Sequence, residues 1–438
     1  MDISKNGRFC HVALHRALEE HQFLSKRDRA FITRVCEGTM ERLIEIDYII
    51  NQFSTVPVAR MKPVICNIMR SACYQICFMG GVPSNASVNE AVMLAQSKGF
   101  YNLKGFVNGV LRNIARHVEA GDIEYPDPVK NRMEHLSVKY SMPRWIVKYW
   151  NDAYGEDVTD IMLDSFVKER PTTVRFKTDG IDKETILESL KEQNVHVVKA
   201  PYLPYAYDIS EYNYLPALNA FKKGWIFPQD IGSMLPVEVA GLKAGDYVID
   251  MCAAPGGKSL HAADKMGSFG MVDARDLTAD KVALIRENVK RADLINIQPR
   301  VMDALTFDQD SVDKADVVIC DLPCSGLGVI GRKPDIKYRL TLTQIEELAQ
   351  LQKRILHNAA SYVKPGGTLI FSTCTVSPLE NTENVKYFEA NYPFRLDSLD
   401  PFLPKELQQL TTSEGYLQVV PGIHQADGFF VARFVKEG

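Results

Sequence analysis

Two cysteines stand where apolar, strand-like runs open into polar loops. Cys374 is the last residue of GTLIFSTC (367–374), and Cys324 lies in DLPCSG (321–326), after another such run. A cysteine that only fills a core is expected inside an apolar run, because free Cys is among the most buried residue types. A thiol at a strand end in a cleft is partly exposed, which a nucleophile requires. We therefore take both as candidate nucleophiles, although for either residue alone a core position is the commoner explanation.

The chain contains nine cysteines, an odd number, scattered over 438 residues. The segment MDISKNGRFC at the start lacks the apolar stretch of a secretion signal, so we expect a cytoplasmic protein with reduced thiols. A disulfide between Cys324 and Cys374 is therefore disfavoured. The pairs CYQIC (73–77) and CDLPC (320–324) have no His-rich partner pattern, so no metal site is expected.

The cysteine-bearing runs belong to an alternation of strands and helices that begins near residue 226. Two amphipathic helices, 278–292 and 342–363, separate near-continuous apolar strands, which is typical of a parallel sheet covered on both faces. The segment 415–436 indicates two strands joined by a loop, so an antiparallel hairpin should close the sheet. The expected strands are YVIDMCAA (247–254), GMVDARD (270–276), IQPRVMDA (297–304), ADVVICDLP (315–323) and GTLIFSTC (367–374).

Ligands of such sheets bind outside the carboxyl ends of the strands. Those ends carry the glycine-rich turn DMCAAPGGK (250–258), then Asp276, Asp303 and Asp321, and finally the two cysteines. For any one of these residues a helix cap or a core position would be a sufficient explanation. Polar or reactive groups at five consecutive strand ends indicate a binding site along this edge.

The turn APGGK (254–258) lets the backbone approach a ligand closely at a helix N-terminus. It matches neither GxGxxG nor GxxxxGK[ST], so a phosphate-binding loop is not supported. Asp276 lies twenty residues after Gly256, the spacing at which a carboxylate on the second strand binds ribose hydroxyls. A nucleoside without a pyrophosphate fits this edge, and S-adenosylmethionine is such a ligand. Asp303 would then accept a hydrogen bond from the adenine amino group.

A methyl donor beside a thiol nucleophile suits the methylation of carbon 5 of cytosine. Carbon 5 is a poor nucleophile until a thiolate adds to carbon 6, and covalent catalysis then divides one hard step into easier ones. Adjacent parallel strands lie about 5 Å apart, so both sulfurs reach one base if the strands before Cys324 and Cys374 are neighbours. Asp321 is placed to act as a general acid near N3. The spacing does not decide which cysteine attacks.

The loop that follows Cys324, GLGVIGRKPDIKYR (326–339), is strongly basic. Cations with an interleaved aromatic residue suit the backbone of single-stranded RNA, and the target base must leave its helix to enter the pocket. A solvated charged loop explains this segment equally well when it is taken alone. The candidate RNA-binding residues are Arg332, Lys333, Lys337 and Arg339, with Tyr338 among them.

The first 118 or so residues indicate helices only. They carry fifteen Lys and Arg against nine Asp and Glu, a net charge of +6, and because the whole chain has −4 the remainder has −10. A basic part joined to an acidic part suggests nucleic-acid binding, although a solvated helical surface explains the charge at least as well. One expected helical face runs from Ile32 to Ile50, and another helix is expected to start with a capping box, Ser87 with Glu90.

Composition divides the chain into three parts. A polar segment with two prolines, 119–131, follows the helices, and short strands and helices then alternate to about residue 225. We predict an all-α domain over 1–125, a small α/β subdomain over 126–225 and a larger α/β domain over 226–438. No run of eighteen apolar residues exists, so we expect no membrane-spanning helix and no membrane partner. A monomer is expected.

Three motifs of the last domain resemble the Nop/Sun family of RNA cytosine-C5 methyltransferases. They are DMCAAPGGK (250–258), DLPCSGLGVIGRKPDIKYR (321–339) and STCTVSPLENTENV (372–385). The segments SKRDRAFITRVCEGTMERLIEIDYII (25–50) and VNEAVMLAQSKGFYNLKGFVNGVLRNI (88–114) resemble a NusB-like RNA-binding domain. The combination is similar to the Sun/Fmu type of this family, which acts on bacterial 16S rRNA. The resemblance implies a class I, Rossmann-like methyltransferase domain, S-adenosylmethionine as the methyl donor and 16S rRNA as the substrate.

The resemblance also implies roles for individual residues of these motifs. Asp276 would bind the ribose of the donor, Asp303 its adenine region, and Asp321 would lie against the donor and the target base. Cys374 would be the nucleophile, and Cys324 would promote release of the product. The residues of the glycine-rich turn that would contact S-adenosylmethionine are Cys252, Ala253, Ala254, Pro255, Gly256, Gly257 and Lys258.

Two other functions fit parts of the sequence. The helical domain alone would suit a non-enzymatic RNA-binding factor for ribosome assembly or antitermination, but such a scaffold needs neither the cysteines nor the glycine-rich turn. A nicotinamide-dependent oxidoreductase would also be built on an α/β sheet, but the missing GxGxxG motif speaks against it.

Overall fold

The computed structural model describes residues 10–21, 23–168, 170–267 and 269–438. The chain divides into two compact units: one contains the chain up to Val167 together with Ile330–Arg339, and the other contains Lys168–Val329 and Leu340–Gly438. The segment 330–339 therefore belongs to the first unit, although its sequence neighbours on both sides belong to the second. The three-part division expected from the sequence stays a prediction.

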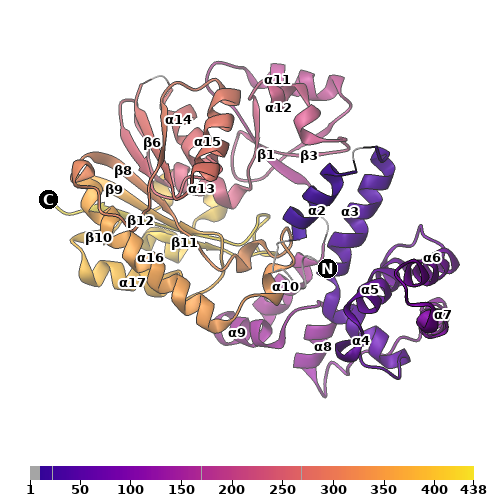
Figure 1. Cartoon of the computed structure of the whole chain (residues 1–438). Coiled ribbons are helices and arrows are strands. Elements are labelled where there is room, and N and C mark those ends of the chain that lie inside the picture. The colour runs from indigo at the N-terminus through magenta and orange to yellow at the C-terminus, as the bar shows by residue number, and fades with distance from the viewer. Residues whose placement is uncertain (1–9, 22, 169, 268) are drawn as a thin grey trace. The chain divides into compact units, whose positions relative to one another are not determined.

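The described part of the first unit is helical. Its main core is formed by the apolar faces of four helices, α4 to α7, which bury Ile46, Met69, Ala91 and Leu111 among others. These helices are drawn in indigo and violet in Figure 1. The α-helices of this unit are α2 (Cys10–Glu19), α3 (Lys26–Glu41), α4 (Leu43–Phe53), α5 (Pro63–Phe78), α6 (Ser84–Ser97), α7 (Lys104–Ala120), α8 (Arg132–Lys139), α9 (Arg144–Tyr154) and α10 (Glu156–Phe166).

Two expectations for these helices are wrong. The apolar face from Ile32 to Ile50 is divided between two helices, because α3 ends before Arg42, whose backbone (φ −102°, ψ 19°) leaves the helical conformation. The capping box at Ser87 does not form, because α6 already begins after Pro83, whose carbonyl accepts from the Ser87 N–H. Ser87 is thus buried inside the helix, and its Oγ has no hydrogen-bond partner among the described residues.

The second unit begins with a small antiparallel sheet of order β2-β3-β1-β4. The buried guanidinium of Arg175 in β1 donates to the carboxylate of Asp264 at 2.5 Å, and the Asp179 N–H donates to the same carboxylate at 3.0 Å. Asp264 lies in helix α14 (Gly257–Met266), which packs on the larger sheet described next, so this contact ties the two sheets together. The elements are β1 (Thr172–Phe176), α11 (Lys183–Glu192), β2 (His196–Lys199), β3 (Ala206–Ser210), α12 (Asn219–Lys222) and β4 (Ile226–Pro228).

The larger sheet has eight strands. Strands β5 to β9 run parallel in the order β9-β8-β5-β6-β7, and β12 pairs antiparallel with β9, β10 and β11. The mixed sheet with a C-terminal hairpin is therefore confirmed, and the short strand β10 is an addition to it. The strands are β5 (Tyr247–Asp250), β6 (Met271–Asp276), β7 (Ile297–Val301), β8 (Ala315–Asp321), β9 (Val363–Thr373), β10 (Phe394–Leu396), β11 (Tyr416–Val419) and β12 (Phe429–Lys436).

Helices cover both faces of this sheet, as the near-continuous apolar strands predict. Val248 of β5 packs into a core shared with α14 and α15, whereas the next residue, Ile249, packs into a core shared with α16 and α17. Figure 1 shows these two pairs of helices on opposite sides of the strands. The α-helices are α13 (Ile231–Val239), α14 (Gly257–Met266), α15 (Ala279–Ala292), α16 (Leu342–Tyr362), α17 (Thr382–Asn391) and α18 (Leu410–Glu414). Within the described ranges, no helix has the length and apolar character needed to cross a bilayer.

Candidate active site

The strand order brings the candidate site residues to one edge of the larger sheet. β5 lies between β6 and β8, and β8 pairs with β9 so that Asp321 stands opposite Ser372. The loops that follow these two positions carry Cys324 and Cys374, and they therefore start side by side. We call this carboxyl edge of β5–β9, with its loops, the rim.

The turn after β5 depends on Gly256, whose φ is +107°. A Cβ at this position would also lie 3.4 Å from side-chain atoms of Ile285 and Leu260, so the conformation and the packing both favour glycine. At Gly257, the first residue of α14, an added Cβ would meet nothing nearer than Gln229 Cδ at 3.9 Å. There is thus room for a ligand beside Gly257 at the start of α14, and N–H groups at a helix N-terminus can bind a negatively charged group.

Asp250, the last residue of β5, is a site candidate that the sequence analysis missed. Its Oδ2 accepts from Ser259 Oγ at 2.6 Å, while its Oδ1 is buried and accepts no hydrogen bond from the described residues. Burial raises the pKa of Asp250 to about 7, against the lowering effect of the Ser259 hydrogen bond. The signal that could have identified it is its place at a strand end, the same criterion that selected Asp276.

Cys252 lies two residues further, in the turn itself. Burial raises the pKa of its thiol, and the carboxylates of Asp250 and Asp276 raise it further. Cys252 therefore keeps its proton at neutral pH, which suits a packing or contact role rather than nucleophilic attack.

Asp276, at the end of β6, holds the turn from the neighbouring strand. Its Oδ2 accepts from the Ala254 N–H at 2.9 Å, its Oδ1 accepts from the Leu277 N–H at 2.7 Å, and the Lys281 ammonium lies 3.0 Å from Oδ1. Oδ2 has a second lone pair, so Asp276 can still accept a hydrogen bond from a ribose hydroxyl. Its predicted role stays a prediction.

Asp303 follows β7 and is exposed. Its Oδ1 accepts from the Leu305 N–H at 2.9 Å, which folds the loop back after the strand. The second carboxylate oxygen is available for an external donor. The structure thus places Asp303 on the rim, and its expected contact with adenine is not tested.

Asp321, at the end of β8, is joined to the glycine-rich turn by an ion pair. Lys258 Nζ donates to Asp321 Oδ2 at 2.6 Å and to Ser233 Oγ at 3.0 Å, and Ser372 Oγ donates to Asp321 Oδ1 at 3.0 Å. The Lys258 side chain is 9% exposed and that of Asp321 28%. Lys258 is thus engaged with protein groups, and it fixes the carboxylate that faces the loops of the two cysteines.

The sulfur atoms of Cys324 and Cys374 lie 3.2 Å apart, as expected for loops on neighbouring strands. Both cysteines are free thiols and partly buried. The hydrogen bond with Cys374 raises the pKa of Cys324 well above its usual range, and burial raises it as well. Cys324 therefore retains its proton and can donate it in an S–H···S hydrogen bond to Cys374.

The loop after Cys324 is held by a close approach of two glycines. The Gly428 N–H donates to the Gly328 carbonyl at 2.9 Å, and the Gly328 N–H donates to the Cys374 carbonyl at 3.1 Å. A Cβ on Gly328 would lie 2.0 Å from the Gly428 carbonyl oxygen, so no other residue fits there without a shift of the backbone.

A buried carboxylate, Glu380, connects the two cysteine loops. Its oxygens accept from the Ser325 N–H at 2.7 Å and from Ser325 Oγ at 2.5 Å. Ser325 Oγ also lies 2.7 Å from Thr375 Oγ1, and Gln352 Nε2 donates to the Pro323 carbonyl at 2.9 Å and to Glu380 at 3.3 Å. Each loop is therefore fixed at the residues directly next to its cysteine.

Asn381 continues this network on the Cys374 side. It accepts from Thr373 Oγ1 at 2.6 Å and donates to the Thr375 carbonyl at 3.1 Å and to Gln418 at 2.8 Å. Gln418 in turn donates to the Thr375 carbonyl at 3.2 Å. Thr373 and Thr375, on either side of Cys374, are thus both held by amide side chains. Residue spacing does not predict this role of Asn381 and Gln418.

The basic segment 330–339 differs from the expectation. Lys337 is 3% exposed, and its ammonium donates to the Glu41 carbonyl at 2.9 Å within the first unit. Burial, the larger effect, together with the positive charge of Arg42 lowers the pKa of Lys337 to about 7. Tyr338 packs beside it, and its hydroxyl lies 3.1 Å from Ser141 Oγ. Lys337 therefore does not face solvent in this structure, whereas Arg332 and Lys333 are exposed.

Comparison with known proteins places this arrangement in a family. Three family models match in order along the chain: the NusB family over 2–116, the ferredoxin-like domain of RsmF/B-like methyltransferases over 142–212, and the 16S rRNA methyltransferase RsmB/F over 238–435. The probable ribosomal RNA small subunit methyltransferase B of Bacillus subtilis (strain 168) is 33% identical over 442 residues, which cover 100% of this chain and 96% of that protein. This chain belongs to the RsmB/F family of 16S rRNA methyltransferases.

Other relatives agree with this assignment. The ribosomal RNA small subunit methyltransferase B of Vibrio vulnificus (strain YJ016) is 31% identical, and the match covers 96% of this chain and 94% of that protein. The crystal structure of PH0851 has a TM-score of 0.81 and 27% identity, covering 96% of this chain and 93% of that one. NSun6 from Pyrococcus horikoshii with SFG has a TM-score of 0.60 and 23% identity, covering 68% and 98%, and shows a likeness of fold.

The membership confirms the resemblance to the Nop/Sun family, the Rossmann-like fold with a NusB-like domain, and S-adenosylmethionine as the methyl donor. The enzyme is an S-adenosylmethionine-dependent rRNA methyltransferase. The alternatives of a non-enzymatic RNA-binding factor and of an oxidoreductase are thereby set aside.

Proposed function

We propose that this RsmB/F family member methylates carbon 5 of a cytosine in 16S rRNA through a covalent bond between Cys374 and carbon 6 of the base. The observation that carries the proposal is the pair of free thiols on the rim, with Cys324 Sγ 3.2 Å from Cys374 Sγ. A methyltransferase acting on a ring nitrogen or a ribose hydroxyl needs no nucleophilic sulfur, whereas attack by carbon 5 does. That the enzyme acts as a cytoplasmic monomer stays a prediction.

The residues of the donor site fit S-adenosylmethionine. A ribose hydroxyl of the donor matches the second lone pair of Asp276 Oδ2, the carboxylate of the donor matches the N–H groups at the start of α14, and the adenine amino group matches Asp303. The buried Oδ1 of Asp250, which lacks a partner, would accept from a cationic amino group. When bound, the donor supplies an electrophilic methyl group and leaves as a neutral thioether. Residues 252–258 and Asp321 complete the proposed contacts.

In the first step, the thiolate of Cys374 adds to the target base. A bond forms between Sγ and carbon 6, and the electron pair of the C5–C6 double bond is displaced through the ring toward N3. N3 takes a proton from Asp321 as general acid, and Asp321 draws this proton from the Lys258 ammonium that donates to it at 2.6 Å. Carbon 5 then has enamine character and can form the new bond to the methyl group. The ion pair with Lys258 and the hydrogen bond from Ser372 fix the Asp321 carboxyl for this transfer.

In the second step, the adduct is resolved. The proton at carbon 5 passes to water, its bonding electrons re-form the C5–C6 double bond, and the bond between carbon 6 and Sγ breaks. The proton on N3 returns through Asp321 to Lys258. Cys374 leaves as a thiolate, and the S–H of Cys324 donates a hydrogen bond to it. This bond stabilises the leaving sulfur, so Cys324 promotes release while the raised pKa of its thiol keeps it protonated.

Arg332 and Lys333, whose side chains are exposed, would contact the RNA, with Arg339 as a further contact. We leave Lys337 out of this set because its ammonium is buried and bound to the Glu41 carbonyl. Its place in the basic segment is better explained by anchoring the segment within the first unit. The expected RNA contact of the other three residues is sequence-independent, through phosphates.

The test is to identify the product. Unmodified 16S rRNA, transcribed in vitro and also supplied as assembled small subunits, is incubated with the enzyme and S-adenosylmethionine. Bisulfite sequencing should then find a single protected cytosine, and digestion should yield 5-methylcytidine. Methyl transfer to a ring nitrogen or to a ribose hydroxyl, with no 5-methylcytidine, would contradict the proposal.

A further inference from the structure

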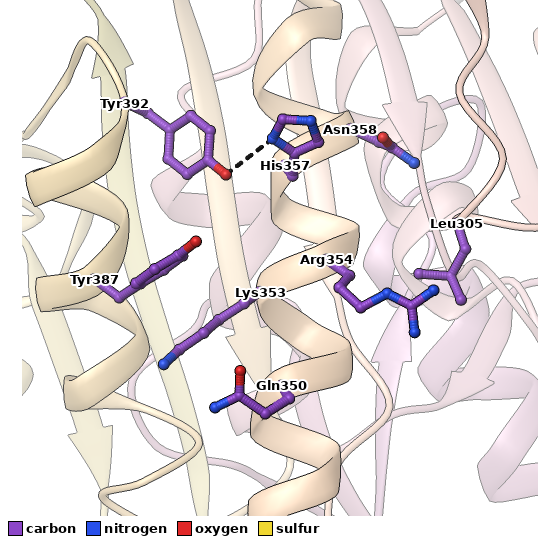
Figure 2. A pocket seen from close by; sticks show the side chains of 8 residues that line it. All are labelled: Leu305, Gln350, Lys353, Arg354, His357, Asn358, Tyr387 and Tyr392. Atoms are coloured by element: carbon purple, nitrogen blue, oxygen red, sulfur yellow. Dashed lines mark hydrogen bonds between the residues drawn. The ribbon is translucent and has the colours of Figure 1, made fainter.

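A cavity of about 420 Å³ lies beside α16 in the methyl-transfer unit. It is lined by Gln350, Lys353, Arg354, His357 and Asn358 of α16, by Tyr387 of α17 and Tyr392 just after it, and by Leu305 of the loop after β7. Figure 2 shows Lys353 reaching toward Tyr387 on one side of the helix and Arg354 reaching to the other side. The proposed reaction uses none of these residues.

The charges of this cavity are not neutralised by the protein. No Asp or Glu lines it, and within the described residues neither Lys353 nor Arg354 takes part in an ion pair. The helix cannot supply one, because the positions three and four residues away from these cations hold Ala, Gln, Leu, His and Asn only. By contrast, Lys386 of α17 is paired with Glu383 at 2.8 Å, and Lys364 of β9 is paired with Asp316.

Several other lining groups can donate hydrogen bonds. His357 Nδ1 lies 3.0 Å from the Tyr392 hydroxyl, and the Lys353 ammonium lies 4.6 Å from the centre of the Tyr387 ring. Burial, followed by the neighbouring Tyr387, raises the pKa of Tyr392 to about 12, so this hydroxyl stays protonated. A cation on a phenol ring, a second cation and several donors suit an anion that offers many acceptor oxygens.

We propose that this cavity binds the phosphate backbone of the rRNA substrate, away from the base that is methylated. The proposal rests on the rRNA methyltransferase function. α16 contacts the rim at Gln352, whose side chain donates to the Pro323 carbonyl beside Cys324 at 2.9 Å, and Lys353 is the next residue of the helix. The cavity is therefore within reach of the nucleotides that flank the target base. Side chains of these types make the sequence-independent contacts that position RNA.

The test measures binding of in vitro transcribed 16S rRNA to the full-length protein as a function of KCl concentration. The double variant Lys353→Gln/Arg354→Gln removes two cations. The matched control, Arg286→Gln/Lys290→Gln, removes an exposed Arg and an exposed Lys of α15 on the opposite face of the sheet, which likewise have no ion pair among the described residues. Stabilisation by S-adenosylmethionine on heating shows that each variant is folded.

We expect the α16 variant to bind RNA about tenfold more weakly near 0.1 M salt and to lose about 1.5 from the slope of log Kd against log salt, as for two lost phosphate contacts. The α15 control should stay within twofold of the wild type. An unchanged slope in the α16 variant, or an equal loss in both variants, would overturn the proposal. Normal binding of free rRNA with impaired methylation of assembled subunits would point to a protein partner and also overturn it. If the α16 variant differs from the wild type by this slope but the wild-type enzyme forms no 5-methylcytidine, only the proposed reaction is contradicted.

Discussion

The two halves of the rim are built in different ways. The donor half, formed by the ends of β5, β6 and β7, uses carboxylates that bind the backbone of nearby loops: Asp276 holds Ala254 and Leu277, and Asp303 holds Leu305. The thiol half, formed by the ends of β8 and β9, is held by side chains from far along the chain. Glu380 reaches across 55 residues to Ser325.

The donor half is thus built to bind a ligand, whereas the thiol half is built to hold two side chains in place. The donor half needs a turn with room for a ligand beside Gly257, and one buried oxygen of Asp250 has no partner among the described residues. The thiol half must keep two sulfurs 3.2 Å apart, so its loops are fixed by a buried polar network that leaves little freedom. Mutations in the two halves should therefore change different measured quantities.

The largest effect is expected for Cys374→Ala. Removing the proposed nucleophile should lower the rate of methyl transfer by on the order of 10³-fold or more, while binding of S-adenosylmethionine stays within twofold because the donor half is intact. Single-turnover methylation and calorimetric titration with the donor measure the two quantities.

The control for this variant is Cys320→Ala, which removes a fully buried thiol from the interior of β8. It should lower stability and leave the rate per folded molecule nearly unchanged. Methylation that persists in Cys374→Ala would show that another residue attacks the base.

The next effect concerns Glu380, which we regard as a positioning residue. Glu380→Ala leaves the buried Ser325 N–H without an acceptor, at a cost of about 1–3 kcal/mol, and leaves Thr375 Oγ1 as the partner of the Ser325 hydroxyl. The displaced sulfur should lower kcat by about 10- to 100-fold, with the Kd for the donor unchanged.

Glu380→Gln tests whether this effect is positional. Burial raises the pKa of Glu380, and a glutamine oxygen can still accept from the Ser325 N–H, so this variant should recover most of kcat. Equal losses in the Ala and Gln variants, or a loss of donor affinity in both, would remove the distinction between the two halves.

Asp250→Asn probes the donor half through pH. The folded pKa of Asp250 is about 7 against an ordinary value of 3.8, so the folded protein binds this proton more tightly than the unfolded chain. The contribution of Asp250 to stability is therefore complete below about pH 4 and is lost as the pH rises toward 7.

The Asn variant does not titrate, and its carbonyl can still accept from Ser259. It should unfold at a higher temperature than the wild type at pH 8 and show a smaller difference, or none, at pH 5. The free-energy difference at pH 8 is on the order of 2–4 kcal/mol. A constant difference between the proteins from pH 5 to pH 8, measured by thermal unfolding, would mean that Asp250 is ionised when buried.

The smallest effects are expected in the basic segment. Arg332→Gln and Lys333→Gln should each weaken rRNA binding by about two- to tenfold. Each should also reduce the slope of log Kd against log salt by the amount expected for about one lost phosphate contact. Lys337→Gln should leave the salt dependence unchanged, because its ammonium is bound to the Glu41 carbonyl. Filter binding at several salt concentrations would measure this, and equal slopes for all three variants would contradict the assignment.

Strand ends could be predicted from the sequence because apolar runs stop where the sheet stops. The same rule found Asp276, Asp303, Asp321 and both cysteines, and the order of the strands then brought them together. It also passed over Asp250, which was treated as part of the glycine-rich turn. The position of Asp250 at the end of an apolar run predicts a site residue by the same rule.

The rest could not be predicted from local pattern. Glu380 and Asn381 stand in a polar run, where nothing distinguishes a buried acceptor from a solvated side chain until the loops fold against each other. Lys337 resembles its neighbours in a basic segment, but packing in the first unit buries it while Lys333 stays exposed. Likewise, Ser87 had the spacing of a helix cap, and Pro83 started the helix earlier.

The central claim is that sulfur of Cys374 bonds to the base during turnover. The most direct measurement is a denaturing gel of Cys324→Ala after incubation with 16S rRNA and S-adenosylmethionine, followed by mass spectrometry of any retarded band. Without the S–H donor for the leaving thiolate, the adduct should accumulate, and its peptide should carry a 5-methylcytidine linked to Cys374. The double variant Cys324→Ala/Cys374→Ala should give no such band. The absence of a retarded band in the single variant, or its persistence in the double variant, would contradict the proposed covalent mechanism.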